Sequence, residues 1–223
     1  MNQSTRQLLQ ERLKDERSKR VIFVSHCLLN ENTRYLGGAF RQGCLDEIVD
    51  SFQQEGLGIY QMHCPEQRAW GGVLKRHLLP IYGSKGSLLY RLRHVLLPLF
   101  IWYTRWRYWR LAKEVLRDIE DYVRSGFEVA GIVGVGGSPS CGVCIRLDLR
   151  RSFEIVAGCP LAQLDRRLMN EEVIAACLRE GQGLFMEALQ RQLMRKHLAI
   201  RWYEHELLAE IRGQPIHLQA KKA

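Results

Sequence analysis

Three of the seven cysteines stand where thiols from distant parts of the chain could meet. Cys27, Cys64 and Cys141 each follow an apolar segment of strand length. In an α/β sheet the carboxyl ends of parallel strands lie along one edge, and ligands bind in the crevice outside that edge. Three thiolates on an iron–sulfur cluster, which is normally held by four, would leave one iron open to a substrate. The alternative is that these thiols are small buried hydrophobic side chains.

The remaining four cysteines have other interpretations. Cys177 lies in an apolar run and Cys44 at the start of a predicted helix, so we expect both to be structural. Cys144 forms a C-x-x-C pair with Cys141, which alone suggests a dithiol or half of a zinc site. Cys159 follows a further apolar run, so it is either a fourth ligand, which would close the site, or a nearby thiol.

Alternating strands and helices must position these residues. We expect strands over 21–24, 58–62, 129–135 and 153–157, and helices over 43–55, 111–124 and, with breaks near 181–183 and 199, over 170–212. This alternation predicts an α/β fold: a Rossmann-like, mainly parallel sheet flanked by helices, with a helical insertion and a helical C-terminal part. The strands are continuously apolar, which favours burial on both faces.

Composition and charge pattern divide the chain into segments. The hydrophobic fraction of 46% and the charged fraction of 26% exclude a disordered chain. We expect a polar N-terminal arm over 1–19, an α/β domain over 20–165 with a helical insertion over about 80–112, C-terminal helices over 166–213 and a polar tail over 214–223. Because no uncharged run is long enough for a membrane span and the N-terminus lacks an apolar signal core, we expect a cytoplasmic protein.

The three cysteine segments resemble a known family. His26-Cys27-Leu28-Leu29-Asn30, then Cys64-Pro65-Glu66 with a glycine pair soon after, and Ser138-Pro139-Ser140-Cys141-Gly142 are similar to the signature segments of the 2-thiouracil desulfurases and their relatives. The order is the same, and the resemblance covers roughly residues 20–165. It implies an α/β domain with a [4Fe-4S] cluster on Cys27, Cys64 and Cys141. The family reaction removes sulfur from a thiocarbonyl heterocycle without net redox change.

The resemblance also implies roles for residues beside the cysteines. Glu66 would be the acid/base, and a serine of the turn, Ser138 or Ser140, would lie near the substrate. The chemistry is consistent: an iron without a protein ligand is a Lewis acid for the soft sulfur of a C=S group, and an ionised carboxylate can take a proton from attacking water. Backbone N–H groups of Gly136 and Gly137 would stabilise the developing charge. The alternatives are a solvated loop carboxylate and helix-capping serines.

Residues 88–110 differ in composition from the rest of the chain. They hold three of the five tryptophans together with five arginines, in a helical apolar stripe that Pro98 should kink. Three interpretations compete: a helical arm packed on the core or on a second subunit, giving a homo-oligomer; an interfacial membrane helix; and an RNA-binding surface. The net charge of +9 favours the last two.

The sequence therefore supports three hypotheses for function. The first is [4Fe-4S]-dependent, non-redox desulfuration of a small thiocarbonyl substrate, such as a thiolated nucleobase. The second is a non-catalytic metal-binding protein that associates with RNA or a membrane surface through residues 88–110. The third is a thiol-redox protein that uses Cys141 and Cys144.

Overall fold

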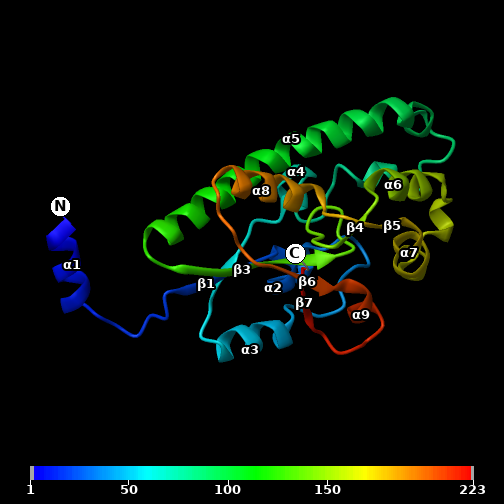
Figure 1. The fold of residues 1–223 in the computed structure, drawn as a ribbon. Coiled ribbons are helices and arrows are strands. Elements are labelled where there is room, and N and C mark those ends of the chain that lie inside the picture. The colour runs from blue at the N-terminus through cyan, green and yellow to red at the C-terminus, as the bar shows by residue number, and fades with distance from the viewer. Residues whose placement is uncertain (1–2, 222–223) are drawn as a thin grey trace.

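A five-stranded, mostly parallel sheet forms the centre of the protein (Figure 1). A computed structural model describes residues 3–221. Across the sheet the strands are β2 Gly58–Gln61, β1 Arg20–Val24, β3 Glu128–Gly136, β6 Trp202–Glu206 and β7 Leu218–Ala220. The first four run parallel and β7 is antiparallel to β6. A separate antiparallel pair joins β4 Ile145–Leu147 to β5 Leu178–Glu180. The Rossmann-like α/β fold predicted from the sequence is confirmed.

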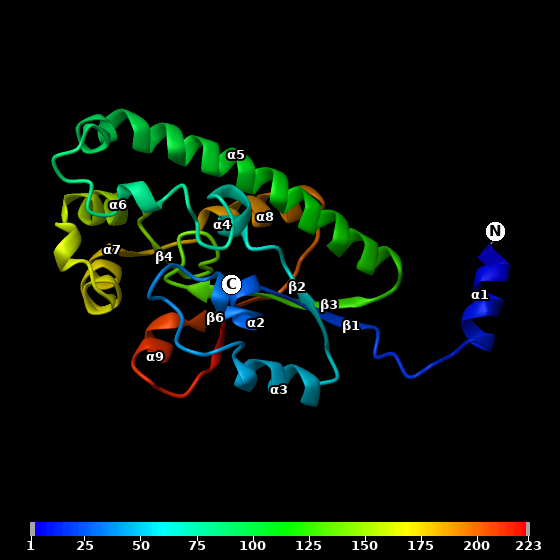
Figure 2. The same cartoon turned by 180° about the vertical axis from the view of Figure 1, so that it is seen from behind.

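Helices cover both faces of the sheet. The helices are α1 Gln3–Arg12, α2 His26–Leu29, α3 Asp46–Gln54, α4 Pro65–Ala69, α5 Leu88–Arg124, α6 Leu149–Gly158, α7 Ile174–Cys177, α8 Leu184–Arg195 and α9 Leu207–Ile211, with single 3-10 turns at Glu31–Thr33, Leu79–Ile81 and Leu161–Gln163 and a π-helix at Leu168–Val173. In both ribbon views α5 and α8 lie over one face, α3 and α9 lie over the other, and α1 stands apart at the end of an extended segment (Figures 1 and 2). Within residues 3–221, none of these helices combines the length and hydropathy that a bilayer crossing requires.

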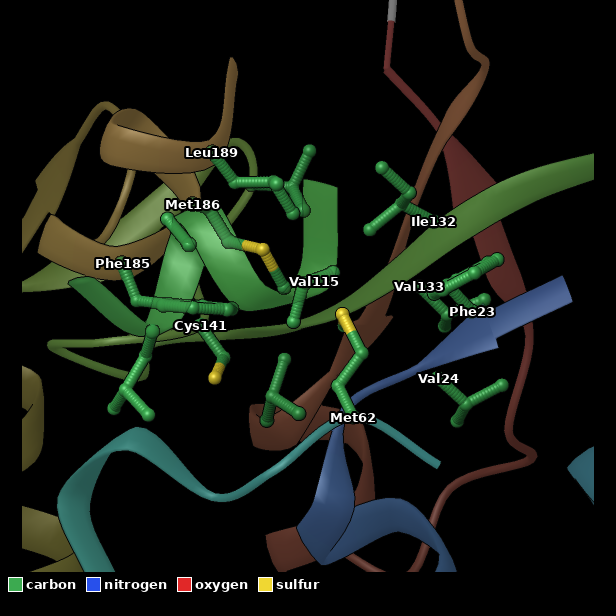
Figure 3. Close-up of a cluster of buried hydrophobic side chains, with 14 of the residues drawn as sticks. Phe23, Val24, Met62, Val115, Ile132, Val133, Cys141, Phe185, Met186 and Leu189 are labelled. Carbon is green, nitrogen blue, oxygen red and sulfur yellow. The ribbon is translucent and has the colours of Figure 1, made fainter. Parts of the chain in front are cut away.

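The core lies between the central strands and the helices α5 and α8 (Figure 3). Phe23 and Val24 of β1 and Ile132 and Val133 of β3 are fully buried. Because both faces of these strands are covered, they contain continuous apolar runs rather than alternating ones. Cys141 packs at the edge of this cluster, so the core itself supports the segment that carries that thiol.

The longest element, α5, unites two predicted segments. The predicted insertion from residue 88 onward and the predicted helix over 111–124 form one helix of 37 residues, with Pro98 inside it. A proline inside a helix removes one backbone hydrogen bond and its ring clashes with the preceding turn. The helix nevertheless continues past Pro98, with buried residues on both sides of it that include Leu97, Tyr108 and Ile119. The inner face of α5 therefore reaches from the sheet to the region of the cysteines.

The predicted strand over 153–157 is wrong, because these residues belong to α6. Asp148 caps this helix by accepting a hydrogen bond from the Arg151 N–H, and the buried Leu149, Phe153 and Val156 lie on one helical face. A short apolar run does not distinguish a buried strand from a buried helix. Cys159 consequently follows a helix.

The C-terminal part is less helical than predicted. The predicted helices over 166–213 include strands β5 and β6, and the predicted tail includes β7. Strand β6 reads Trp-Tyr-Glu-His-Glu, yet Glu204 and His205 are buried between β3 and β7. Because its sequence is polar, β6 was not predicted, although it is an interior strand of the sheet. The breaks predicted near 181–183 and 199 do separate elements. The ends of the predicted arm and tail, residues 1–2 and 222–223, lie outside the described residues.

Candidate functional site

Three cysteines from three loops lie at the carboxyl edge of the sheet. Cys27 is in α2, which follows β1, and Cys64 caps the N-terminus of α4, which follows β2. Cys141 lies in the turn after β3, where its N–H donates to Ser138 Oγ at 3.0 Å. Parallel neighbouring strands thus bring residues 27, 64 and 141 to one edge.

Cys64 and Cys141 are buried, Cys27 is partly buried, and the three thiols lie within electrostatic range of one another. Burial, followed by the proximity of Cys27 and Cys64, raises the pKa of Cys141 well above its ordinary value. Burial, Glu66 and Cys27 raise the pKa of Cys64 to about 12. Burial also raises the pKa of Cys27, although Arg34 opposes the shift. All three cysteines are therefore neutral thiols at pH 7 in this structure, and ligation of a metal would release their protons.

A cavity of about 120 Å³ opens beside these thiols. Cys27, Cys141, Glu66 and Ser138 line it. Most of the remaining wall is apolar and comes from four segments of the chain, represented by Trp70, Leu78, Phe153 and Ile174. Ligand sites are commonly apolar pockets with a few convergent polar groups, and this cavity has that composition.

The Glu66 carboxylate is held at both oxygens. Ser140 Oγ donates to Glu66 Oε1 at 3.0 Å, and Lys75 Nζ lies 3.2 Å from Glu66 Oε2. Tyr108 of α5 lies behind the serine, with its hydroxyl 2.8 Å from Ser140 Oγ. Both Tyr108 and Ser140 are fully buried. Glu66 is therefore neither a solvated loop carboxylate nor free to rotate.

Lys75 is itself held in an unfavourable conformation. Its φ of 49° lies in the left-handed region, which costs a non-glycine residue about 1 kcal/mol. Its side chain is buried, and Nζ donates to the Thr33 carbonyl at 2.6 Å in addition to pairing with Glu66. Strained residues cluster at functional sites, where surrounding contacts over-determine them. The two contacts of Nζ supply that constraint here.

A second buried charge network lies behind Cys27. Arg34 makes a two-pronged ion pair with Glu210, at 2.8 and 2.9 Å, and His205 Nε2 lies 2.7 Å from the same carboxylate. Burial alone would raise the pKa of Glu210, but the hydrogen bonds from His205 and Arg34 lower it to about 2. Burial and a hydrogen bond with Glu210 raise the pKa of Glu31. The cationic partners of Glu210 thus favour its ionised form.

Arg34 connects this network to the cavity. Burial lowers the pKa of Arg34, whereas Cys27 and Glu210 raise it by more, so the pKa lies above its ordinary value. The residue lines the cavity, and its buried Nε has no hydrogen-bond partner among the described residues. A buried N–H without an acceptor is costly unless a bound group satisfies it.

Strand β6 fixes the turn that carries Cys141. Glu204 Oε2 accepts hydrogen bonds from the N–H groups of Val143 and Cys144, both at 2.6 Å, and a longer one from Ile145. Gly134 lets this turn approach β3, because a Cβ there would lie 2.3 Å from the Cys141 carbonyl oxygen. A buried carboxylate and a missing side chain together determine where the thiol lies.

Three cysteines supply soft sulfur donors at this edge of the sheet. Among residues 3–221, no three His, Cys, Asp or Glu side chains are grouped to bind one metal ion. A [4Fe-4S] cluster instead presents each iron to a separate thiolate, so its ligands surround a volume rather than converge on a point. Cys27, Cys64 and Cys141 provide soft sulfur donors, and two of them border the cavity. In the chemistry of their donor atoms, these residues fit such a cluster.

The other predicted site residues have different positions. Ser138 lines the cavity, and its hydroxyl accepts from the Ser140 and Cys141 N–H groups. Gly137 N–H donates to the Ile145 carbonyl. The prediction that this N–H stabilises charge on a substrate is therefore wrong. Cys144 does not line the cavity.

Cys159 also lies apart from the cavity wall, at the C-terminus of α6. Sequence reasoning did not identify Lys75, Arg34 or Tyr108 as site residues. Of these, only the arginine gave a signal, since it follows Cys27 by seven residues in a loop after the first strand. Lys75 and Tyr108 meet the site only through the tertiary fold.

Comparison of the chain with family models, with curated proteins and with solved structures finds no match.

Proposed function

We propose that this protein is a [4Fe-4S]-dependent desulfurase that removes sulfur from a small thiocarbonyl compound, such as a thiolated nucleobase, and releases sulfide without net redox change. The proposal rests mainly on one observation: a carboxylate held at both oxygens, Glu66, lines the same cavity as Cys27 and Cys141. The resemblance of the three cysteine segments to the 2-thiouracil desulfurases points to the same chemistry.

The cofactor of this proposal is a cluster bound by Cys27, Cys64 and Cys141. When bound, it would supply a Lewis-acidic iron that takes the sulfur of the substrate. The buried cations Arg34 and Lys75 favour the thiolate form that ligation requires, since both lower the pKa of Cys27. Cys144 and Cys159 stay outside the ligand set in this proposal.

Glu66 acts as the base toward water. Its two oxygens are oriented by Ser140 and Lys75, which leaves a lone pair on each for a water in the cavity. The carboxylate takes a proton as the water oxygen attacks the thiocarbonyl carbon, and returns it to the departing sulfur or ring nitrogen. Arg34 borders the cavity, and the positive charge of its guanidinium stabilises negative charge that develops on the heterocycle. Ser138 contacts the substrate from the turn.

The cavity favours a small and largely apolar substrate. Its volume of about 120 Å³ lies well below the range of about 300–1,000 Å³ typical of pockets for larger ligands. Trp70 and Phe153 offer aromatic surfaces on which a planar ring can pack. A free thiolated base suits these dimensions better than a nucleotide or a base within RNA.

Anaerobic reconstitution tests the proposal. We expect a brown protein with about four irons that releases sulfide from 2-thiouracil. Cys141→Ser should lose both the iron and the activity, whereas Glu66→Gln should keep the iron and lower kcat by about 10²-fold or more. Cys159→Ser, which alters a thiol outside the cavity wall, is the matched control and should retain both.

Two results would overturn the proposal in favour of the other hypotheses. A colourless protein that binds one zinc and has no sulfide release would indicate a non-catalytic metal-binding protein. Disulfide reductase activity that is lost in Cys144→Ser would indicate a thiol-redox protein.

A further inference from the structure

The first turns of α5 expose an apolar face to the outside of the molecule. Six of its residues have exposed fractions between 43% and 70%: Leu88, Leu92, Val95, Leu99, Trp102 and Trp106. Their spacing alternates between four and three residues, so they form one stripe along the helix. The buried Leu97, Thr104 and Tyr108 lie on the opposite side. In both ribbon views no other element covers the outer side of α5 (Figures 1 and 2).

All of the protein's excess positive charge lies in and before this helix. Residues 67–113 contain ten lysines and arginines and no aspartate or glutamate. The rest of the chain holds 23 basic and 24 acidic residues. Within α5, Arg91, Arg105 and Arg110 are exposed. An apolar stripe bordered only by cations is the pattern of a helix that lies in the interface of an anionic membrane.

We propose that the outer face of α5 binds the surface of an anionic phospholipid bilayer. Its inner face keeps the helix attached to the protein, so the helix lies parallel to the membrane plane. Leu92, Val95 and Leu99 enter the boundary of the acyl chains, and Trp102 and Trp106 occupy the headgroup layer. Arg110 lies 5.2 Å above the Trp106 ring, where its charge can reach lipid phosphates.

The charge pattern disfavours a second copy of this chain as the partner that covers the apolar stripe of α5. The spacing of four and three residues is also that of a coiled-coil seam. In a paired helix, however, Arg91, Arg105 and Arg110 flank that seam without any acidic partner, so like charges would face each other.

The exposed aliphatic residues disfavour RNA. Arginines could contact phosphates, and Trp102 and Trp106 could stack on bases. Leu88, Leu92 and Leu99 would gain nothing from such a partner, although they make up half of the stripe. Only an acyl-chain boundary buries the aliphatic and the aromatic residues of the stripe together.

Flotation with vesicles of pure phosphatidylcholine, and of phosphatidylcholine mixed with phosphatidylglycerol, tests this proposal. We expect the full-length protein to bind the anionic vesicles selectively and less strongly at high salt. Leu99→Ser with Trp102→Ser should weaken binding about tenfold or more. Arg91→Gln with Arg105→Gln should weaken it about thirtyfold and flatten the salt dependence.

A matched control separates the effect of this surface on vesicle binding from the effect of losing any exposed leucine. Leu36 is 55% exposed in a loop far from α5 in sequence, against 58% for Leu99, and Leu36→Ser should bind as the wild type does. Far-ultraviolet circular dichroism checks that each variant is folded. The proposal is wrong if the anionic vesicles do not bind the protein, or if Leu99→Ser with Trp102→Ser binds them unchanged.

Two further results would also overturn the proposal. Concentration-dependent dimerisation without vesicle binding, lost when Leu99 is replaced, would assign the stripe to a second copy. RNA binding without vesicle binding would assign it to nucleic acid. Because none of these measurements uses iron or thiouracil, failure of the membrane proposal is distinguishable from failure of the proposed activity.

Discussion

The hydroxyl of Tyr108 is the point at which α5 enters the candidate site, and its removal tests the hydrogen-bond chain to Glu66. Ser140 has a single hydroxyl proton, which it donates to Glu66 Oε1, so Tyr108 must be the donor in its 2.8 Å contact with Ser140 Oγ. Tyr108→Phe removes this hydrogen bond within a fully buried region. We expect it to lower the free energy of unfolding by about 1 kcal/mol.

Ser140→Ala removes the same hydrogen bond from the other side and should cost more. It leaves the buried Tyr108 hydroxyl without its acceptor and takes one donor from Glu66. The expected loss in the free energy of unfolding is about 2–3 kcal/mol, because burial of an unpaired polar group adds to the lost bond. The double variant should cost about 1 kcal/mol less than the sum of the single variants.

Urea denaturation measures these free energies, and sulfide release at a temperature where all variants are folded measures catalysis. Tyr108 does not line the cavity, so Tyr108→Phe should lower kcat severalfold and leave KM unchanged. Tyr122→Phe is the control on the same helix, since its ring contacts with Phe23 and Phe127 persist without the hydroxyl. Additive losses in the double variant, or equal losses of kcat in the two tyrosine variants, would refute the reasoning.

Other contacts around the site lead to further predictions. The pKa of Glu210 is lowered to about 2 from 4.5, despite burial, by its histidine and arginine partners, so its stabilisation is present above pH 4.5 and lost as the pH falls toward 2. Glu210→Gln should therefore cost about 3 kcal/mol at pH 7 and almost nothing near pH 2 in urea titrations. Gly134→Ala should lower the free energy of unfolding by about 1–3 kcal/mol and reduce iron retention, because the new Cβ would collide with the Cys141 carbonyl. Glu204→Gln should weaken the same turn by about 1–3 kcal/mol, measured by urea denaturation.

The first strands and the residues that follow them were predictable because their signal is local. The apolar runs that became β1, β2 and β3 are short and bounded by turn residues. Parallel pairing of these strands then placed Cys27, Cys64 and Cys141 at one edge of the sheet. The position of Glu66 two residues after a cysteine was also visible in the sequence.

The failure at β6 has a physical cause, which is that burial of a polar residue depends on a distant partner. The strand β6 looks too polar for the centre of a sheet, but Glu204 is satisfied there by three backbone N–H groups of the Cys141 turn. The failure at α6 has a different cause, because the short apolar run over 153–157 suits a buried helix as well as a buried strand.

By itself, then, the sequence determined the α/β fold class, the positions of the first three strands along the chain, the positions of the thiols after them and the concentration of positive charge in residues 67–113. Only the tertiary structure decided that Lys75 and Tyr108 complete the surroundings of Glu66 and that the outer stripe of α5 stays uncovered. Strand periodicity is a property of neighbouring residues, whereas a buried ion pair or an exposed face exists only after segments far apart in the chain have packed.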